Sequence, residues 1–390
     1  MPRLASVSQC TGCTACISIC PQNCIQMKED DAGFAFPEII DQSSCIACGL
    51  CERICPMLTN KKCDRDLSTV AYAAFSKNNS LRFESSSGGI FSELASVVLD
   101  LGGIVYGASY DEKGVVRHIG IESYEKLEKL RGAKYSQSIL GNTFRLLKNH
   151  LDSGKAVLFS GTPCQVVGLR AFLRKDYDKL ICLDFVCHGI PSPMVWKKYV
   201  GYRAHTDNNE IYPQRINMRN KESGWSRYSY SVEFLYSEKN RYLCKNNNDL
   251  FMNLFVNDYI LRKSCSACNF KGYSRISDIT LGDFWGIWNI DPNMDDNKGT
   301  SLVLIHSSKG KELFGKILKD IKIKKVTLEQ ASRENPSLIS SSKHKWNRDQ
   351  ILNEIFQNGF QTVEATLKTE KNGENKLQRL YRNLLGKLSN

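Results

Sequence analysis

Two stretches near the start of the chain carry cysteines at the same spacing. Each reads C-x2-C-x2-C-x3-C and is followed by proline, and together they comprise Cys10, Cys13, Cys16, Cys20, Cys45, Cys48, Cys51 and Cys55. Three closely spaced thiolates on one short loop can bind three irons of a cubane cluster, while backbone N–H groups of the loop point at its sulfurs. Four-cysteine zinc sites usually combine two separated C-x2-C pairs, so the spacing favours iron–sulfur clusters over zinc.

The repeated run is typical of bacterial ferredoxins that carry two 4Fe-4S clusters. In that arrangement the fourth cysteine of each run crosses over to the other cluster. We therefore expect one cluster on Cys10, Cys13, Cys16 and Cys55, and the other on Cys45, Cys48, Cys51 and Cys20. The predicted chemistry is electron transfer. Cys24 and Cys63 lie outside the pattern and are left unassigned.

A second group of cysteines lies much later in the chain, in loops with unusual neighbours. Its members are Cys164 in SGTPCQV, Cys187 in FVCHG, and Cys265 with Cys268 in RKSCSACNF. A C-x2-C pair is half of a metal site and needs two more ligands. Cys164 and Cys187 both follow predicted strands, and the ends of strands are where sites collect in α/β folds.

Several motifs in this region resemble one family, the coenzyme F-420 hydrogenase/dehydrogenase beta subunits. The resemblance extends from Ser85 to about Ser308, and the order of the motifs carries it. The motifs are SSGG at Ser86 to Gly89, AKYSQS at Ala133 to Ser138, GTPCQ at Gly161 to Gln165, CHG at Cys187 to Gly189, SCSAC at Ser264 to Cys268, DITLGDFWG at Asp278 to Gly286, and KGTS at Lys298 to Ser301.

The resemblance implies a domain that binds FAD and carries its own 4Fe-4S cluster. Two-electron exchange would occur at the flavin and one-electron steps would pass through the clusters. Matched by motif, the ligands of this third cluster are Cys164, Cys187, Cys265 and Cys268. The alternative is that some of the four are buried thiols without a metal.

The resemblance also suggests where the flavin would bind. Ser87, Gly88 and Gly89 resemble a phosphate-side loop, because glycine lets the backbone approach an anion at the start of a helix. The remaining cofactor positions would be Lys134, Tyr135, Ser136, Gln137, Asp283 and Trp285, with the lysine suited to phosphate and the aromatic rings to packing. Structural duties in the core and in turns are the alternative for each of them.

His188 follows one of the predicted ligands directly. It could shuttle a proton as a catalytic residue, or it could be a hydrogen-bonded scaffold residue. Cys182 and Cys244 fall within predicted strands and are expected in the core.

Composition limits the classes of partner and the compartment. The chain has 390 residues, of which 42% are hydrophobic and 24% charged, and 53 basic against 41 acidic residues give a net charge of +12. Positive charge suits acidic partners, but no basic block is interleaved with aromatics, so nucleic acid is not expected. There is no signal-peptide core and no apolar run of the ~20 residues that span a membrane, so we expect a cytoplasmic protein with reduced thiols.

Periodicity divides the chain into four parts. We expect a two-cluster ferredoxin-like module over residues 1–60, a linker over 61–69, a mixed-sheet flavin and iron–sulfur domain over 70–325, and a helical region over 326–390. Predicted strands cover residues 70–75, 103–109, 115–121, 155–159 and 180–186, antiparallel strands fall within 211–244, and helices cover 88–101 and 250–261. The fold class is therefore α+β with a mixed α/β sheet.

The last segment, KLQRLYRNLLGKL, places Leu377, Leu380, Leu384 and Leu388 on one helical face. We expect that face to pack on the body of the protein or on a partner subunit rather than on a membrane surface.

These features predict an iron–sulfur flavoprotein oxidoreductase that passes electrons between a hydride carrier, FAD and 4Fe-4S clusters. Coenzyme F-420, with its acidic tail, or a ferredoxin would be the partner. The alternative is an electron-relay subunit that feeds a separate reductase and has no substrate chemistry of its own. The GASYDEKG stretch lacks the G-x-G-x-x-G order, so direct binding of a nicotinamide cofactor is not expected.

Overall fold

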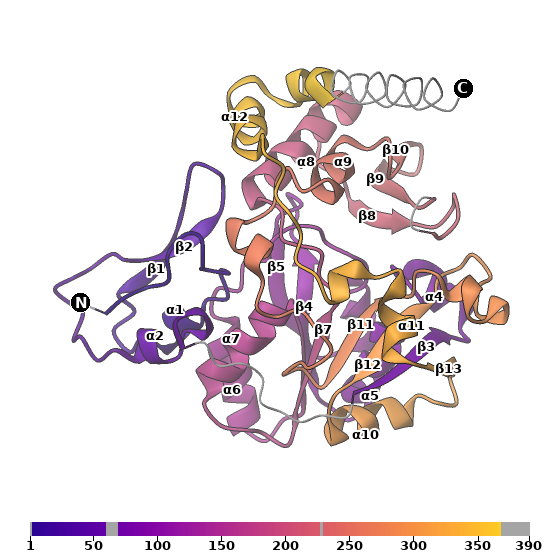
Figure 1. Cartoon of the computed structure of the whole chain (residues 1–390), viewed down its shortest axis with the longest axis horizontal. Helices are drawn as coiled ribbons and strands as arrows, with labels where there is room; N and C mark the ends of the chain where they lie inside the picture. Colours follow the sequence, from indigo (N-terminus) through magenta and orange to yellow (C-terminus); the bar gives the residue numbers. More distant parts are fainter. Residues whose placement is uncertain (1, 60–68, 227–228, 368–390) are drawn as a thin grey trace, which may run out of the picture.

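The computed structural model describes residues 2–59, 69–226 and 229–367. Most of the predicted linker, with Cys63, and the KLQRLYRNLLGKL segment lie outside these residues. The N-terminal part is a small module at one side of the molecule (Figure 1). It consists of an antiparallel hairpin and three short helices: β1 (Ile25–Glu29), β2 (Ala35–Ile39), α1 (Ala15–Ile19), α2 (Leu50–Arg53) and α3 (Pro56–Thr59).

The large domain is built on an eight-stranded mixed sheet, in the order β13-β3-β12-β11-β7-β6-β4-β5. Its central strands β4, β6, β7 and β11 are parallel, and the other pairs are antiparallel. The bounds are β3 (Val70–Ser76), β4 (Ile104–Tyr110), β5 (Val116–Ile121), β6 (Val157–Ser160), β7 (Leu180–Phe185), β11 (Ile279–Asp283), β12 (Ser301–Ile305) and β13 (Ile321–Val326). The mixed fold expected from the sequence is confirmed.

Helices cover both faces of this sheet, because successive strand residues point to opposite sides. On β6, Leu158 packs with α5 (Ile90–Asp100) and α10 (Ser308–Lys316), while Val157 and Phe159 pack with α6 (Thr143–Asp152) and α7 (Pro163–Leu173). The remaining helices are α4 (Asn79–Glu84), α8 (Pro193–Asn208), α9 (Leu250–Val256), α11 (Leu328–Arg333) and α12 (Arg348–Asn358).

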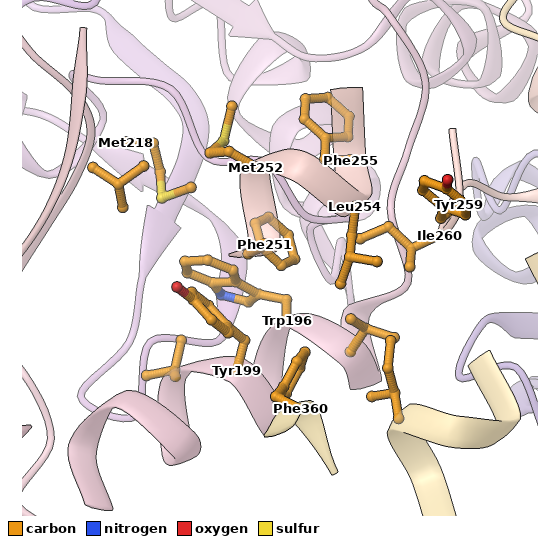
Figure 2. Close-up of a cluster of buried hydrophobic side chains, with 14 of the residues drawn as sticks. Trp196, Tyr199, Met218, Phe251, Met252, Leu254, Phe255, Tyr259, Ile260 and Phe360 are labelled. Atoms are coloured by element: carbon orange, nitrogen blue, oxygen red, sulfur yellow. The ribbon is translucent and has the colours of Figure 1, made fainter. Parts of the chain in front are cut away.

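A second, three-stranded antiparallel sheet follows, with β8 (Arg215–Asn220), β9 (Ser231–Ser237) and β10 (Asn240–Lys245). It packs with α8, α9 and α12 around a core rich in aromatic rings (Figure 2). The Trp196 ring centroid lies 4.8 Å from that of Phe251, and the indole N–H donates to the Gly114 carbonyl at 2.7 Å. Tyr199 meets Phe360 at 5.3 Å, so the C-terminal region packs on the body as far as it is described.

One predicted helix ends earlier than expected. The apolar pattern indicates a helix to Leu261, but α9 stops at Val256 because Asp258 adopts a left-handed conformation with φ 66°. The chain then runs extended beside residues 190–192: the Ser192 N–H donates to Ile260 O at 2.9 Å, and the Arg262 N–H donates to Ile190 O at 2.8 Å. This pairing brings the Cys265 and Cys268 segment alongside the loop that follows Cys187.

The N-terminal module is docked on the large domain through α1. Arg145 of α6 donates to the carbonyl oxygens of Ser18 at 2.8 Å, Cys20 at 2.9 Å and Ile17 at 3.2 Å. These carbonyls lie at the carboxyl end of α1, where helix carbonyls lack the usual donors one turn further on; Ile17 O and Cys20 O also accept from the N–H groups of Cys20 and Asn23. A side chain of the large domain therefore completes the helix end of the module.

Among the described helices, none combines the length and apolar character needed to cross a membrane.

Candidate functional site

The two cysteine runs of the module share a backbone conformation as well as a spacing. Gly12 and Ala47, at equivalent positions, have φ of 70° and 50°, and Thr14 and Gly49, two residues later, have φ of 60° and 68°. Left-handed residues alternating with right-handed ones turn successive N–H groups into one concavity, which suits an anionic group. Ala47 and Thr14 adopt this conformation despite their Cβ atoms, so the loop shape is preserved in both repeats.

Each predicted set of four thiols lines its own pocket. One pocket encloses about 430 Å³, partly open to solvent, and its lining includes Cys10, Cys13, Cys16 and Cys55. The other encloses about 320 Å³, and its lining includes Cys20, Cys45, Cys48 and Cys51. Cys55 of the second run lines the first pocket, together with Cys51, and Cys20 of the first run lines the second pocket; the crossover of ligands stays a prediction. The thiol donors present therefore fit two 4Fe-4S clusters.

Burial favours the protonated form of several of these thiols in the absence of a cation. It raises the pKa of Cys13 to about 11, and it also raises the pKa of Cys16 and Cys55. Hydrogen bonds from the backbone N–H group of Ala15 to Cys13 and from that of Ile17 to Cys16 lower the pKa of these two thiols. A positive charge such as iron is needed to favour the thiolates that bind it.

Cys24, which the sequence left unassigned, lies at the second of these pockets. Its Sγ is 3.5 Å from that of Cys20, the side chain is buried, and it lines the pocket beside Cys45. The position four residues after Cys20 was the available signal. This thiol is thus a fifth cysteine beside the second set.

The four cysteines of the large domain are also brought together. Cys164 follows β6 in the first turn of α7, Cys187 follows β7, and Cys265 lies in the single-turn segment Lys263–Ala267 with Cys268 at its end. Because β6 and β7 are parallel, their carboxyl ends meet at one edge of the sheet. Burial raises the pKa of Cys164, and the thiols of Cys187, Cys268 and Cys265 each add to the effect. All four side chains therefore face the same place.

The donors in this set are suited to a cluster. Thr162 caps α7, and its Oγ1 lies 3.1 Å from Sγ of Cys164; the Ile190 N–H donates to Sγ of Cys265 at 3.4 Å. Among the described residues, no three His, Cys, Asp or Glu side chains are close enough to hold one metal ion. Wider spacing is expected for a cubane cluster, whose four thiolates bind different irons.

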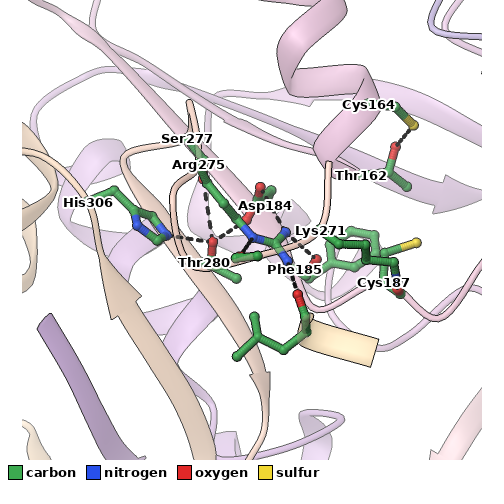
Figure 3. A network of polar contacts seen from close by, with 12 residues as sticks. Thr162, Cys164, Asp184, Phe185, Cys187, Lys271, Arg275, Ser277, Thr280 and His306 are labelled. Atoms are coloured by element: carbon green, nitrogen blue, oxygen red, sulfur yellow. Dashed lines mark hydrogen bonds and ion pairs between the residues drawn. The ribbon is translucent and has the colours of Figure 1, made fainter. Parts of the chain in front are cut away.

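Two cations missed by the sequence analysis lie beside Cys187 (Figure 3). The Lys271 ammonium donates to the carbonyl of Cys187 and, at 2.9 Å, to that of Ser337. Arg275 is buried and lies 3.3 Å from Asp184. Burial raises the pKa of Cys187 to about 12, and both cations oppose the rise. Lys271 follows the CxxC pair by three residues, which was a signal for it.

Asp184 belongs to a buried polar chain that continues through the sheet (Figure 3). Thr280 donates to Asp184, and Oγ1 of Thr280 lies 2.8 Å from Nε2 of His306. The other ring nitrogen of His306 lies 3.1 Å from Oγ1 of Thr69. Burial lowers the pKa of His306 to about 3, so this ring is neutral at physiological pH.

The SSGG motif contacts the KGTS motif. The Gly88 N–H donates to Oγ of Ser301 at 2.9 Å, Ser87 Oγ donates to Thr300 O at 3.0 Å, and Lys221 donates to Ser87 O at 2.6 Å. A Cβ on Gly88 would lie 2.5 Å from the carbonyl oxygen of Ala74, so the loop needs glycine for close packing. Gly89, with φ 87°, begins α5. Two motifs far apart in sequence thus form one corner of the domain.

Three of the predicted flavin positions gather around a residue that the sequence analysis missed, Arg219 of β8. Its guanidinium lies 5.0 Å from the Trp285 ring centroid, and its Nη2 lies 3.1 Å from Oδ2 of Asp283. Tyr135 is the third member: burial raises its pKa, and Arg219 opposes the rise. Arg219 is 3% exposed; its Nη2 is ion-paired with Asp283, and its Nε has no hydrogen-bond partner among the described residues. No local motif marked it.

This group fits a flavin. The aromatic rings of Tyr135 and Trp285, with Trp225 stacked on Trp285 at 4.8 Å, can pack against a planar ring system. A buried cation with an unpaired Nε–H can donate to its electron-rich edge. Asp283 ends β11, which runs parallel to β7, so this group lies at the same edge of the sheet as Cys187.

The predicted flavin positions Lys134, Ser136 and Gln137 have surroundings different from those of the Arg219 group. Lys134 donates to the carbonyls of Arg131 at 2.7 Å and Gly132 at 3.2 Å, and burial lowers its pKa to about 7. Ser136 is buried. Gln137 points away from this group and donates to Thr11 O at 3.1 Å, in the first cysteine loop of the module.

Both ring nitrogens of His188 have side-chain partners. Nε2 lies 2.6 Å from Oδ1 of Asp258, and Nδ1 lies 3.3 Å from Oγ of Ser337. The ring also packs edge-on against Phe255. This geometry is that of a hydrogen-bonded scaffold residue. Of the cysteines expected in strands, Cys182 is buried and Cys244 is half-buried.

Comparisons with known proteins agree with these two parts. Residues 9–58 match the model of the 4Fe-4S dicluster domain, and residues 154–331 match the model of the C terminus of the coenzyme F420 hydrogenase/dehydrogenase beta subunit. A comparison with curated protein sequences found no match. Among solved structures, a chain of the xenon-derivatised F420-reducing NiFe hydrogenase complex from Methanosarcina barkeri is similar, with 16% identity and a TM-score of 0.47 over 75% of this chain and 95% of that chain.

The expected resemblance is thereby confirmed, and it assigns a redox role to the chain. The dicluster domain supports 4Fe-4S clusters in the module, and the second model covers the CHG, SCSAC and GDFWG motifs. The chain thus carries a region that matches the C terminus of the coenzyme F420 hydrogenase/dehydrogenase beta subunit, preceded at the N-terminus by a 4Fe-4S dicluster domain.

Proposed function

We propose that this chain is an iron–sulfur flavoprotein oxidoreductase that exchanges a hydride with a small carrier and single electrons with a redox partner. The observation that supports the proposal is the placement of two groups at one edge of the main sheet. The Arg219 group, with Asp283 at the end of β11, and the four thiols around Cys187, after β7, both lie there. A flavin and a cluster bound in these positions would be neighbours.

In this proposal the chain supplies binding and electrostatics. Cys164, Cys187, Cys265 and Cys268 hold the third 4Fe-4S cluster, with Lys271 and Arg275 as nearby positive charges. Tyr135 and Trp285 pack against the ring system of FAD, and Arg219 donates to its electron-rich edge. Flavin, when bound, converts two-electron chemistry at a carbon substrate into single-electron steps.

The phosphate end of FAD would bind near the SSGG corner. Gly89 begins α5, and a helix start presents N–H groups to an anion. Lys221, whose pKa burial lowers to about 7, lies at this corner, and it is two residues from Arg219 on the chain. Coenzyme F-420 would be the hydride carrier, which the family description suggests, and its acidic tail suits the net charge of +12. A ferredoxin would be the one-electron partner.

The experiment that tests the proposal measures two quantities on anaerobically purified chain. The first is FAD released on denaturation, and the second is viologen reduction by reduced coenzyme F-420 with no other protein present. The proposal expects about one FAD per chain and donor-dependent turnover. Absence of flavin after reconstitution with FAD would contradict it.

A second function is supported by one observation. Both ring nitrogens of His188, the residue expected to shuttle a proton, contact side chains of the chain itself, Asp258 and Ser337, as in a residue that holds a loop in place. The chain would then be an electron-relay subunit that feeds a separate reductase. Reduction of the clusters by dithionite, together with no turnover of any hydride donor, would favour the relay.

A further inference from the structure

The loop of Cys10 is held by residues next to the large domain's CxxC pair. Arg262 donates through Nε to the Cys10 carbonyl at 2.8 Å, and Ser264 Oγ donates to the same oxygen at 3.0 Å. Ser264 directly precedes Cys265. A ligand position of the module and a ligand position of the large domain are thus joined through one side chain.

A second contact joins the two thiol sets through α7. A Cβ atom on Gly168 would lie 2.9 Å from Sγ of Cys13 and 2.8 Å from its Cβ, so the helix and the cysteine touch directly. Cys164 is one turn earlier on α7, and residues four apart in a helix have Cβ atoms about 5–6 Å apart. Cys13 and Cys164 are therefore both neighbours of Gly168: Cys13 contacts it, and Cys164 precedes it by one helical turn.

The junction is rigid because its polar groups are satisfied from both sides. Arg262 is 1% exposed and also donates to Ala35 O at 2.9 Å and to Oε1 of Gln137 at 3.0 Å. The amide nitrogen of Gln137 in turn donates to Thr11 O. The backbone of the first cysteine loop and of β2 is thereby fixed against the large domain.

The other thiol set of the module has a different environment. Cys48 is exposed, and the neighbouring Ile46 is 62% exposed. The residues that line the pocket of this set, from Pro2 to Cys51, are all uncharged. This set can be approached from solvent.

We infer an order of electron transfer along the chain. The centre on Cys10, Cys13, Cys16 and Cys55 lies next to the large-domain centre, electrons cross at the Gly168–Cys13 contact, and the centre on Cys20, Cys45, Cys48 and Cys51 comes last and meets the partner. Each step moves one electron, so one centre is oxidised and its neighbour reduced, and no bond forms. The inference rests on the proposed function, because it needs a metal centre at the large domain's thiols.

The test uses the full chain, reconstituted anaerobically with iron and sulfide and reduced with dithionite. Electron paramagnetic resonance reports the spin–spin broadening of the large-domain signal by its nearest reduced neighbour. Cys13→Ala should change this broadening, whereas Cys48→Ala should leave it as in the wild type. The reverse pattern, or equal effects of the two substitutions, would overturn the order.

A glycine pair tests the crossing point without removing a ligand. Gly168→Ala should keep the wild-type iron content and lose part of the broadening, because the new Cβ must displace Cys13. Gly201→Ala, in α8, is the matched control, since its Cβ meets only Oη of Tyr212, at 3.8 Å, within 4 Å. Unchanged broadening in Gly168→Ala would overturn the crossing point. A wild-type content of about eight irons rather than about twelve would overturn the proposed third centre itself, and it is seen before any variant is compared.

Discussion

At the scale of single residues, the proposed function depends on charged groups that have little access to water. Arg219 is buried among aromatic rings, and its Nε lacks a hydrogen-bond partner among the described residues. Leaving such donors unpaired costs free energy, so a ligand that accepts from them gains affinity. Lys271 and Arg275 are charged groups that lie in the same way beside a proposed cluster ligand, Cys187.

Arg219→Met should weaken FAD binding. A hydrogen bond to a charged group contributes about 1.5–3 kcal/mol, which corresponds to roughly a 10- to 150-fold rise in Kd. Fluorescence titration of the apoprotein with FAD measures this Kd. Arg215→Met, on the same strand with a half-exposed side chain, is the control and should bind FAD as the wild type does. Equal affinity in both variants would exclude Arg219 from the flavin site.

Lys271→Met should lower the midpoint potential of the large-domain centre. Reduction adds negative charge, and a nearby buried cation stabilises the reduced form; its removal should shift the potential by on the order of tens of millivolts. Redox titration followed by paramagnetic resonance gives the value. Lys155→Met, which removes a surface cation paired with Glu122, should leave the potential unchanged.

Two buried histidines give the stability a defined pH dependence. Burial lowers the pKa of His118 to about 4 and that of His306 to about 3, both below the value of 6.5 for a free ring. The unfolded chain therefore binds these protons first, so stability is complete above pH 6.5 and falls as pH drops toward 4. At pH 5 the loss is about 2 kcal/mol for each ring.

Urea unfolding at pH 7 and at pH 5 checks this prediction. His118→Gln should reduce the difference between the two free energies of unfolding, and the exposed His205→Gln should not. A difference that stays the same in His118→Gln would mean that this ring is not neutral in the folded protein.

At the scale of elements, the second sheet and its helices are held by the aromatic core of Figure 2. Trp196→Ala should lower the free energy of unfolding by about 3–5 kcal/mol, because it leaves a cavity and an unpaired Gly114 carbonyl. Trp346→Ala is the matched control, since that indole is 88% exposed, and it should change stability by less than about 0.5 kcal/mol. A similar loss in both variants would contradict the role of this core.

Some elements and ligands can be predicted from the sequence and others cannot, and the reasons are physical. The eight module cysteines have a local spacing, and the strands before Cys164 and Cys187 have buried, apolar patterns, so both can be predicted. The end of α9 could not be, because it depends on Asp258 and on pairing with residues 190–192. Gln137 was expected at the flavin and lies instead at the junction with the module. Arg219 and Arg262 act through tertiary contacts that no local motif records.

At the scale of the whole molecule, the two parts contact each other directly, and the loop of Cys10 touches the segment that carries Cys265. Arg145 completes α1 of the module, and Arg262 fixes its first cysteine loop. The large domain adds a third thiol set at the carboxyl edge of its parallel strands. Cys48 of the module is exposed, and it is there that we propose a redox partner meets the chain.

We propose that the large domain holds its own 4Fe-4S cluster beside a flavin. Iron, acid-labile sulfide and FAD are measured on anaerobically reconstituted wild type and on Cys164→Ala and Cys265→Ala. We expect about twelve irons and one FAD per chain in the wild type, and about eight irons in any variant that loses the third cluster. About eight irons and no flavin in the wild type, unchanged by either substitution, would contradict it and leave a two-cluster relay.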